Sequence, residues 1–133
     1  MQAEFIRKVL HIPWQNRASS FECCDCWGLI VLYYKEVLNI TIPEVLGFTD
    51  DVNFLDCYSS GITQWDEVLS PFEAGLMFTA YKGGSPDHVG LCIGGGKVLH
   101  ARGSVNHGGK VQIHSISALT AVYGKISFHR FKG

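Results

Sequence analysis

The amino-acid sequence predicts an α+β domain in which helices come first and an antiparallel sheet follows. The first observation is a continuous apolar segment over residues 26–38, CWGLIVLYYKEVL, which is too long for an ordinary strand. It is apolar nearly all round until its last turn, as a central buried helix would be. The second observation is a change to strand-type pattern from residue 75 onward, with short segments separated by glycine-rich turns. Helices followed by strands are the order found in α+β domains.

The other elements follow in chain order. A short amphipathic helix is expected over residues 3–11, and residues 12–25 form a loop that leads into the central helix. Between residues 41 and 74, prolines and glycines interrupt short amphipathic pieces, which indicates loops and small helices. Five strands are then expected, over residues 75–81, 88–93, 97–101, 110–114 and 125–131.

Length and composition indicate one compact domain over residues 1–133. Hydrophobic residues make up 47% of the chain and charged residues 17%, which excludes a disordered chain. The net charge of -1 and the scattered basic residues argue against nucleic acid as a partner. No apolar run reaches the roughly 20 residues of a membrane span. The charged residues among the first 14 argue against a signal peptide, so none is expected.

The chain has five cysteines, so they cannot all pair with one another. Without an export signal, reduced thiols are the default state. Cys57 and Cys92 are expected to pack in the interior. Cys23 and Cys24 fall in the loop before the central helix. A zinc site made by these two and Cys26 stays open as an alternative, although adjacent cysteines do not match the usual ligand spacing.

Cys26 is the candidate nucleophile because it stands at the start of the central helix. Asp25 is a good N-cap, which places Cys26 at the first helical position. The helix dipole and the free N–H groups there favour the thiolate and could bind an oxyanion, whereas the Asp25 carboxylate opposes a second negative charge. Gly28 in the first turn would allow close approach of substrate or of another backbone. The alternative is that Cys26 is simply a small buried apolar residue.

The segment HVGLCIGGGKVLHA (residues 88–101) reads as a β-hairpin closed by a loop over residues 94–96. This register places Gly90 opposite His100, with His88 as a diagonal neighbour of His100 on the same face. A two-residue loop would place the two histidines on opposite faces. The space above Gly90 is expected to receive the helix that carries Cys26.

The two histidines match what a thiol nucleophile needs, with His88 as base and His100 as the group that fixes its tautomer. The alternatives are two structural histidines, or a zinc ion held by both and a cysteine. The remaining histidines lack such neighbours and are interpreted as incidental: 11, 107, 114 and 129.

Three motifs together resemble the NlpC-type cell-wall cysteine peptidases. They are IPW at residues 12–14, D-C-W-G-L at 25–29 and HVGLCIGGGKVLHA, and the resemblance covers roughly residues 3–131. It implies a papain-like fold in which a nucleophile-bearing helix packs on an antiparallel sheet of about five strands. It also implies Cys26 as nucleophile, His88 as base and His100 as orienting residue.

The sequence departs from the family pattern at three positions. Family members usually have a Tyr twelve residues before the Cys, where this chain has Trp14, and a Ser after the Cys, where it has Trp27. With Asp25, these two residues are the expected oxyanion and substrate-binding group. The W-x-x-R spacing from Trp14 to Arg17 and the D-C-W-G motif resemble the branch found in phage tail proteins. The G-D-L turn before the first strand is Gly75-Leu76 here, without the Asp.

The resemblance implies a cysteine endopeptidase that hydrolyses an amide bond in peptidoglycan stem peptides, without metal or cofactor. The phage-tail branch implies other tail-tip proteins as partners and a location at the virion tail tip, after synthesis in the host cytoplasm. One alternative is a structural tail-assembly module on the same fold. Another is a related thiol enzyme, such as an amidase or a lipid acyltransferase.

Overall fold

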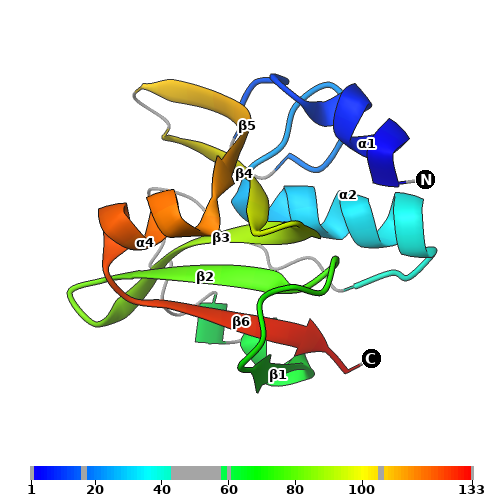
Figure 1. Ribbon diagram of the computed structural model, residues 1–133. Helices are drawn as coiled ribbons and strands as arrows, with labels where there is room; N and C mark the ends of the chain where they lie inside the picture. The colour runs from blue at the N-terminus through cyan, green and yellow to red at the C-terminus, as the bar shows by residue number, and fades with distance from the viewer. Residues whose placement is uncertain (1, 16–17, 43–57, 60, 105–106, 133) are drawn as a thin grey trace.

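The computed structural model describes residues 2–15, 18–42, 58–59, 61–104 and 107–132. A six-stranded antiparallel sheet forms the centre, with α1 (Gln2–Val9) and α2 (Cys26–Leu38) on one side and α4 (Ile116–Tyr123) on the other (Figure 1). The predicted α+β class is therefore confirmed. Within the described ranges, no helix is long and apolar enough to cross a membrane.

Helix α2 begins and ends at the predicted residues because its two ends are capped. The Asp25 carboxylate accepts a 2.7 Å hydrogen bond from the backbone N–H of Gly28, as an N-cap does. At the other end Asn39 adopts a left-handed conformation, with φ 56°, and stops the helix. Helix α4 was not predicted. Ser115 is its N-cap, and the Ser115 Oγ accepts a 3.1 Å hydrogen bond from the backbone N–H of Ala118.

The sheet order is β1-β6-β2-β3-β4-β5. Its strands are β1 (Trp65–Val68), β2 (Met77–Lys82), β3 (Ser85–Gly94), β4 (Lys97–Ser104), β5 (Gly108–Ser115) and β6 (Ile126–Phe131). The last five correspond to the predicted strands. β1 adds a sixth, where loops and small helices were expected. It is short, two of its four residues are charged, and it pairs only with β6, so its own sequence gives little signal of a strand.

The β3–β4 hairpin has the predicted register but a shorter turn. Leu91 pairs with Leu99 and Cys92 with Val98, as expected from a three-glycine loop. The predicted loop was wrong in length, because Gly94 pairs with Lys97 and the register shifts between Cys92 and Gly94. This irregularity compensates for the two-residue turn, so the faces of the strands are not exchanged.

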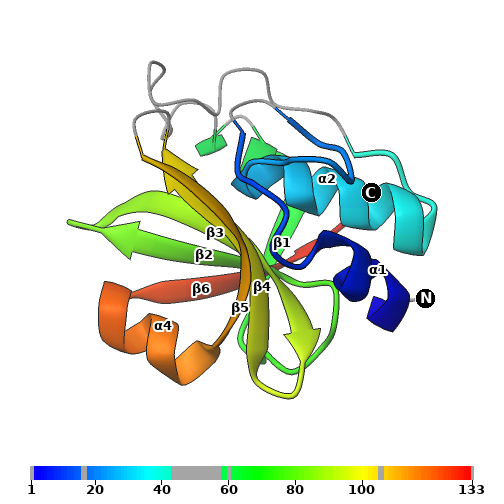
Figure 2. The same ribbon diagram turned by 90° about the horizontal axis from the view of Figure 1, so that it is seen from above.

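The sheet divides beyond the pair Leu91–Leu99, where the pairing between β3 and β4 ends. β3 continues along β2 as far as Ser85, and β4 continues along β5 as far as Ser104. The two strand pairs diverge in both views, and the start of α2 lies near their point of separation (Figures 1 and 2). The fold thus brings the first turn of α2 close to the open end of the β3–β4 hairpin.

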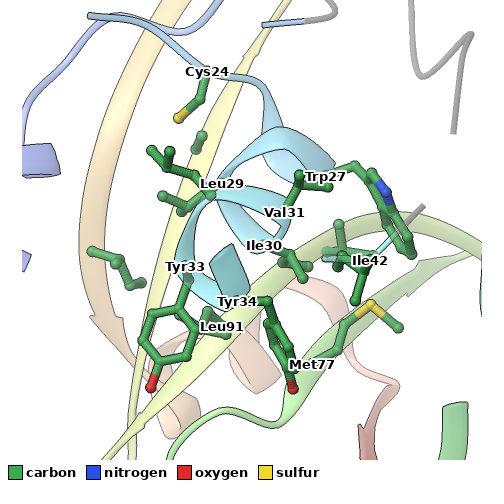
Figure 3. Close-up of a cluster of buried hydrophobic side chains, with 14 of the residues drawn as sticks. Cys24, Trp27, Leu29, Ile30, Val31, Tyr33, Tyr34, Ile42, Met77 and Leu91 are labelled. Carbon is green, nitrogen blue, oxygen red and sulfur yellow. The ribbon is translucent and has the colours of Figure 1, made fainter. Parts of the chain in front are cut away.

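The main core lies between α2 and the sheet, where Leu29, Ile30 and Tyr34 of the helix face Leu91 and Met77 (Figure 3). The apolar stripe of the hairpin lies in this core, since Val89, Leu91, Leu99 and Ala101 are all fully buried there. Burial of apolar side chains in this core is the main stabilising contribution to such a domain.

The position of the helix relative to the hairpin differs from the prediction. α2 covers the apolar stripe, and not the face that carries Gly90 and His100. A Cβ on Gly90 would lie 2.8 Å from Val98 Cγ1 and 2.9 Å from His100 Cβ, so these side chains fill the space that was expected for the helix. The second face packs against α4, in a smaller core that includes Cys92, as expected for a packing residue.

Candidate active site

Cys26 is the first residue of α2, and its side chain is partly exposed. The preceding loop is fixed tightly on the helix, because Asp25 N–H donates to the carbonyl of Ala18 at 3.0 Å. A Cβ on Gly28 would lie 1.9 Å from the same carbonyl oxygen. Gly28 therefore admits the close approach of another backbone, which is one of the two roles expected from the sequence.

The environment of the Cys26 sulfur favours the neutral thiol. Burial, followed by the charge of Asp25, raises the pKa of Cys26 above its ordinary value. The backbone N–H groups of Val89, Trp27 and Cys26 itself act in the opposite direction. The expectation of a lowered pKa was wrong, because desolvation and the adjacent carboxylate outweigh these N–H groups. The contact with Val89 N–H places the thiol beside β3, one residue after His88.

His88 and His100 are joined by a hydrogen bond across the open end of the hairpin. His88 Nε2 lies 2.9 Å from His100 Nδ1, and the two residues are only 6% and 1% exposed. Burial is the main cause that lowers the pKa of His88 to about 3 and of His100 to about 4. The predicted proximity of the two imidazoles is thus confirmed, and both rings are held neutral at physiological pH.

A third histidine extends this pair. His100 Nε2 lies 2.8 Å from Nδ1 of His114, an exposed residue of β5. The interpretation of His114 as incidental was therefore wrong. The signal for it is the diagonal relation already used for the hairpin, since His100 pairs with Gln112 and His114 is two residues further along the same face. Finding it required the β4–β5 register, which the sequence did not provide.

The three hydrogen-bonded rings of His88, His100 and His114 are called the histidine chain. If His88 is to accept a proton, the N–H groups of these rings must all point in one direction. Its Nε2 is bonded to His100, so Nδ1 is the nitrogen available to a thiol. With Nδ1 unprotonated, Nε2–H donates to His100 Nδ1, and His100 Nε2–H donates to His114 Nδ1. Both rings of the buried pair are then fixed in one tautomer.

Tyr123, the last residue of α4, lies against the other side of the His88 ring. The two rings are stacked, with centroids 6.2 Å apart and an interplanar angle of 18°. A charge on Cys26 acts on Tyr123, so the thiol, the imidazole and the phenol belong to one neighbourhood. In the described part of the chain no hydrogen bond joins the Cys26 thiol to His88. The structure brings the pair to the same part of β3 without a hydrogen bond between them. Tyr123 was missed because α4 was not predicted.

The three residues expected to bind the oxyanion or substrate differ in their burial and in their packing partners. Trp14 is partly buried and packs over Gly103, where a Cβ would lie 2.6 Å from its ring. Trp27 is 4% exposed and packs edge-to-face on Trp65, so only its backbone N–H is directed to the thiol. Asp25 is 3% exposed and caps the helix.

Burial raises the pKa of the Cys24 and Cys92 thiols above their ordinary value. Cys23, Cys24 and Cys92 are free thiols, and the pKa of Cys24 is raised to about 12 by burial, then by Asp25 and Cys23. Cys57, like Arg17 of the W-x-x-R motif, lies outside the described residues. Where the chain is described, no three His, Cys, Asp or Glu side chains are grouped as metal ligands would be.

The sequence profile of the NlpC/P60 family matches residues 13–127, a span that includes the helix start and the histidine hairpin. The chain therefore belongs to the NlpC/P60 family. Comparison with curated protein sequences gives no significant match.

Solved structures of this family share the fold. The NlpC/p60 domain of the peptidoglycan hydrolase SagA superposes with a TM-score of 0.61 at 20% identity, covering 96% of this chain and 92% of that one. NlpC1 from Trichomonas vaginalis gives 0.67 at 19% identity, covering 98% of this chain and 42% of that one. An NlpC/P60 protein from Bacillus cereus gives 0.66 at 20% identity, covering 100% and 41%. The chain thus spans nearly all of the first structure and less than half of the other two.

Proposed function

We propose that this chain is a cysteine peptidase that hydrolyses an amide bond in peptidoglycan stem peptides. The observation that carries the proposal is the meeting of the α2 start with the histidine chain at the open end of the β3–β4 hairpin. Membership of the NlpC/P60 family and a fold shared with a peptidoglycan hydrolase domain support this substrate class.

In this mechanism Cys26 starts as a neutral thiol and His88 as a neutral imidazole, because burial opposes charge on both. The proton moves from sulfur to His88 Nδ1 while the sulfur attacks the amide carbonyl, so no isolated thiolate is required. The imidazolium that forms keeps its hydrogen bond to His100. The C=O π electrons move to the carbonyl oxygen, and the backbone N–H groups of Trp27 and Cys26, which lie at the sulfur, are the donors proposed to stabilise this oxyanion.

Collapse of the tetrahedral intermediate then breaks the C–N bond. His88 Nδ1–H gives its proton to the leaving nitrogen, and the acyl group stays on Cys26 as a thioester. Water hydrolyses the thioester with His88 as base, which releases the carboxylic acid and restores the thiol. His100 and His114 act throughout as positioning residues, since they touch His88 directly or through one ring.

We also propose that the protein works as a tail-tip component of a phage particle, where it opens the wall locally during infection. The D-C-W-G motif and Trp14 at the family's Tyr position support this role. The partners would be other tail-tip proteins. Mass spectrometry of purified particles tests the location, because a tail-tip component must be present in them at a constant stoichiometry.

A structural tail-assembly module with weak or no activity is the second candidate. The raised pKa of Cys26 and the lack of a thiol–imidazole hydrogen bond within the described residues favour it. Replacement of Cys26 by Ala separates the two functions. If particles assemble normally with this variant but no longer degrade cell walls, the chain is an enzyme. If assembly requires the chain and wall degradation does not depend on Cys26, the chain is a structural module.

The direct test is digestion of purified peptidoglycan, with the released fragments identified by mass spectrometry. The wild type is expected to release stem peptides with a new amino terminus, whereas Cys26→Ala and His88→Ala release none above background. Cys23→Ala is the matched control and keeps the activity. Release of whole stems by cutting at the sugar–peptide amide would indicate an amidase. Acyl transfer to lipid without peptide release would indicate an acyltransferase.

A further inference from the structure

A cavity of about 300 Å³ lies next to the histidine chain, outside the residues used above for proton transfer. Its walls come from the end of β2 and the turn that follows, the start of β3, β4, and the end of α4. The lining residues are Tyr81, Lys82, Gly83, Asp87, Arg102, Val122 and Tyr123. We propose that this cavity is the subsite for the leaving fragment and that it selects a fragment with a free carboxylate through Arg102 and Lys82. The inference rests on the peptidase function proposed above.

The position of the cavity identifies which part of the substrate it receives. The leaving nitrogen takes its proton from His88, so the fragment attached to that nitrogen must lie on the imidazole side of the sulfur. The cavity is on this side, because Tyr123 in its wall is stacked on the His88 ring and Asp87 directly precedes His88. The acyl part of the substrate stays with Cys26 at the start of α2.

The charges of the lining residues identify the ligand chemistry. Arg102 and Lys82 are exposed cations, and Asp87 is the single acid among the lining residues. In the described part of the chain, no carboxylate forms an ion pair with either cation. A guanidinium binds a carboxylate through two parallel hydrogen bonds, which gives both strength and orientation. The Arg102 guanidinium is held over the Tyr123 ring, 5.5 Å from its centroid, which fixes it at the cavity wall.

Binding of a carboxylate here also acts on the base. Burial is the main cause of the lowered pKa of His88, and the positive charge of Arg102 adds to it. A carboxylate on Arg102 offsets that charge and makes His88 a better proton acceptor. A substrate with the carboxylate is therefore expected to have a higher kcat as well as a lower KM. Loss of a contact that served binding alone would change only KM.

The test compares two synthetic substrates, L-Ala-γ-D-Glu-L-Lys with a free C-terminal carboxylate and the same tripeptide with a C-terminal amide. We expect the wild type to prefer the free acid by roughly tenfold in kcat/KM, as one charge-assisted contact provides. Arg102→Gln should reduce this preference to nearly one, and Arg102→Lys should keep part of it. Lys97→Gln, an exposed lysine at the far end of β4, is the matched control and keeps the full preference. Equal cleavage of both substrates by the wild type would overturn the subsite.

A second measurement does not depend on turnover. The Cys26→Ser variant is titrated with L-lysine and with L-lysinamide while backbone amide chemical shifts are followed by NMR. Lysine should shift the amides of Asp87, Arg102 and Tyr123, and lysinamide should shift them several-fold less. Arg102→Gln in the same background should remove the difference. If neither compound shifts these amides, the subsite is overturned even where the enzyme cleaves stem peptides. If the shifts occur but no stem peptide is cleaved, the peptidase proposal fails instead.

Discussion

At the scale of single residues, His100 has hydrogen-bond partners on both of its ring nitrogens, His88 on one side and His114 on the other. A buried imidazole with two acceptors or two donors facing it would lose one of these bonds. The arrangement is satisfied only when all three rings point their N–H groups the same way. The exposed ring of His114 thus helps to decide the tautomer of His88, two rings away.

This coupling predicts that His114→Phe lowers kcat by roughly tenfold, the equivalent of one lost hydrogen bond. The phenyl ring leaves His100 Nε2–H without its acceptor. His114→Gln supplies an oxygen acceptor and should recover most of the rate. Steady-state kinetics across pH measures the effect, with the exposed His107→Gln as control. Equal rates for the Phe and Gln variants would show that His114 does not position His100.

At the scale of elements, the loop that crosses the start of α2 fixes the position of Cys26. The carbonyl of Ala18 accepts from Asp25 N–H, and it approaches Gly28 so closely that a Cβ there would lie 1.9 Å away. The sequence predicted the helix start and the need for a small residue, because the cap and the glycine are local signals. It did not show which backbone approaches, since contact between a loop and a helix depends on tertiary packing.

The substitution Gly28→Ala separates the effect of helix propensity on stability from the effect of the Ala18 contact, because the two have opposite signs. Helix propensity alone predicts that Ala stabilises the protein by about 1 kcal/mol. The contact with Ala18 predicts a loss of about 1–3 kcal/mol, since the loop must move away from the helix. Urea denaturation measures the free energy of unfolding, with the exposed Lys35→Ala on the same helix as control. A gain in stability for Gly28→Ala would contradict the described packing.

At the scale of the whole molecule, three buried histidines, His88, His100 and His129, make folding sensitive to acid. Burial lowers the pKa of all three below the ordinary value of 6.5, to about 3 for His88 and about 4 for His100. Below pH 6.5 the unfolded chain binds protons at these positions and the folded chain does not. Stability is therefore complete above pH 6.5 and decreases as the pH falls towards 4, by up to about 1.4 kcal/mol per pH unit for each histidine.

The measurement is the free energy of unfolding at several pH values between 7 and 4. Replacing His88 by Phe should reduce the slope, because one of the three histidines with a lowered pKa is lost. The exposed His107→Gln should retain the full slope. An unchanged slope in His88→Phe would mean that this ring is already charged in the folded protein.

Most of the fold was predictable, since α2, the hairpin register and the face shared by His88 and His100 depend on local pattern and on strand alternation. Three features were not. β1 becomes a strand only by pairing with β6. α4 lies in a segment without a charge pattern, so its sequence did not predict a helix. The division of the sheet between β3 and β4 arises from tertiary packing. Because α4 carries Tyr123 and bounds the cavity, the proposed leaving-fragment subsite could not be predicted without this helix.

In the proposed mechanism, Cys26 and His88 act together to form an acyl-enzyme. Acid quenching during turnover of a stem peptide traps this intermediate, and mass spectrometric sequencing of the segment that contains residues 23–26 locates it. We expect the acyl mass on Cys26 alone, with none on Cys23 or Cys24, and its loss in His88→Ala. An acyl group on a different cysteine, or product formation by Cys26→Ala, would contradict it.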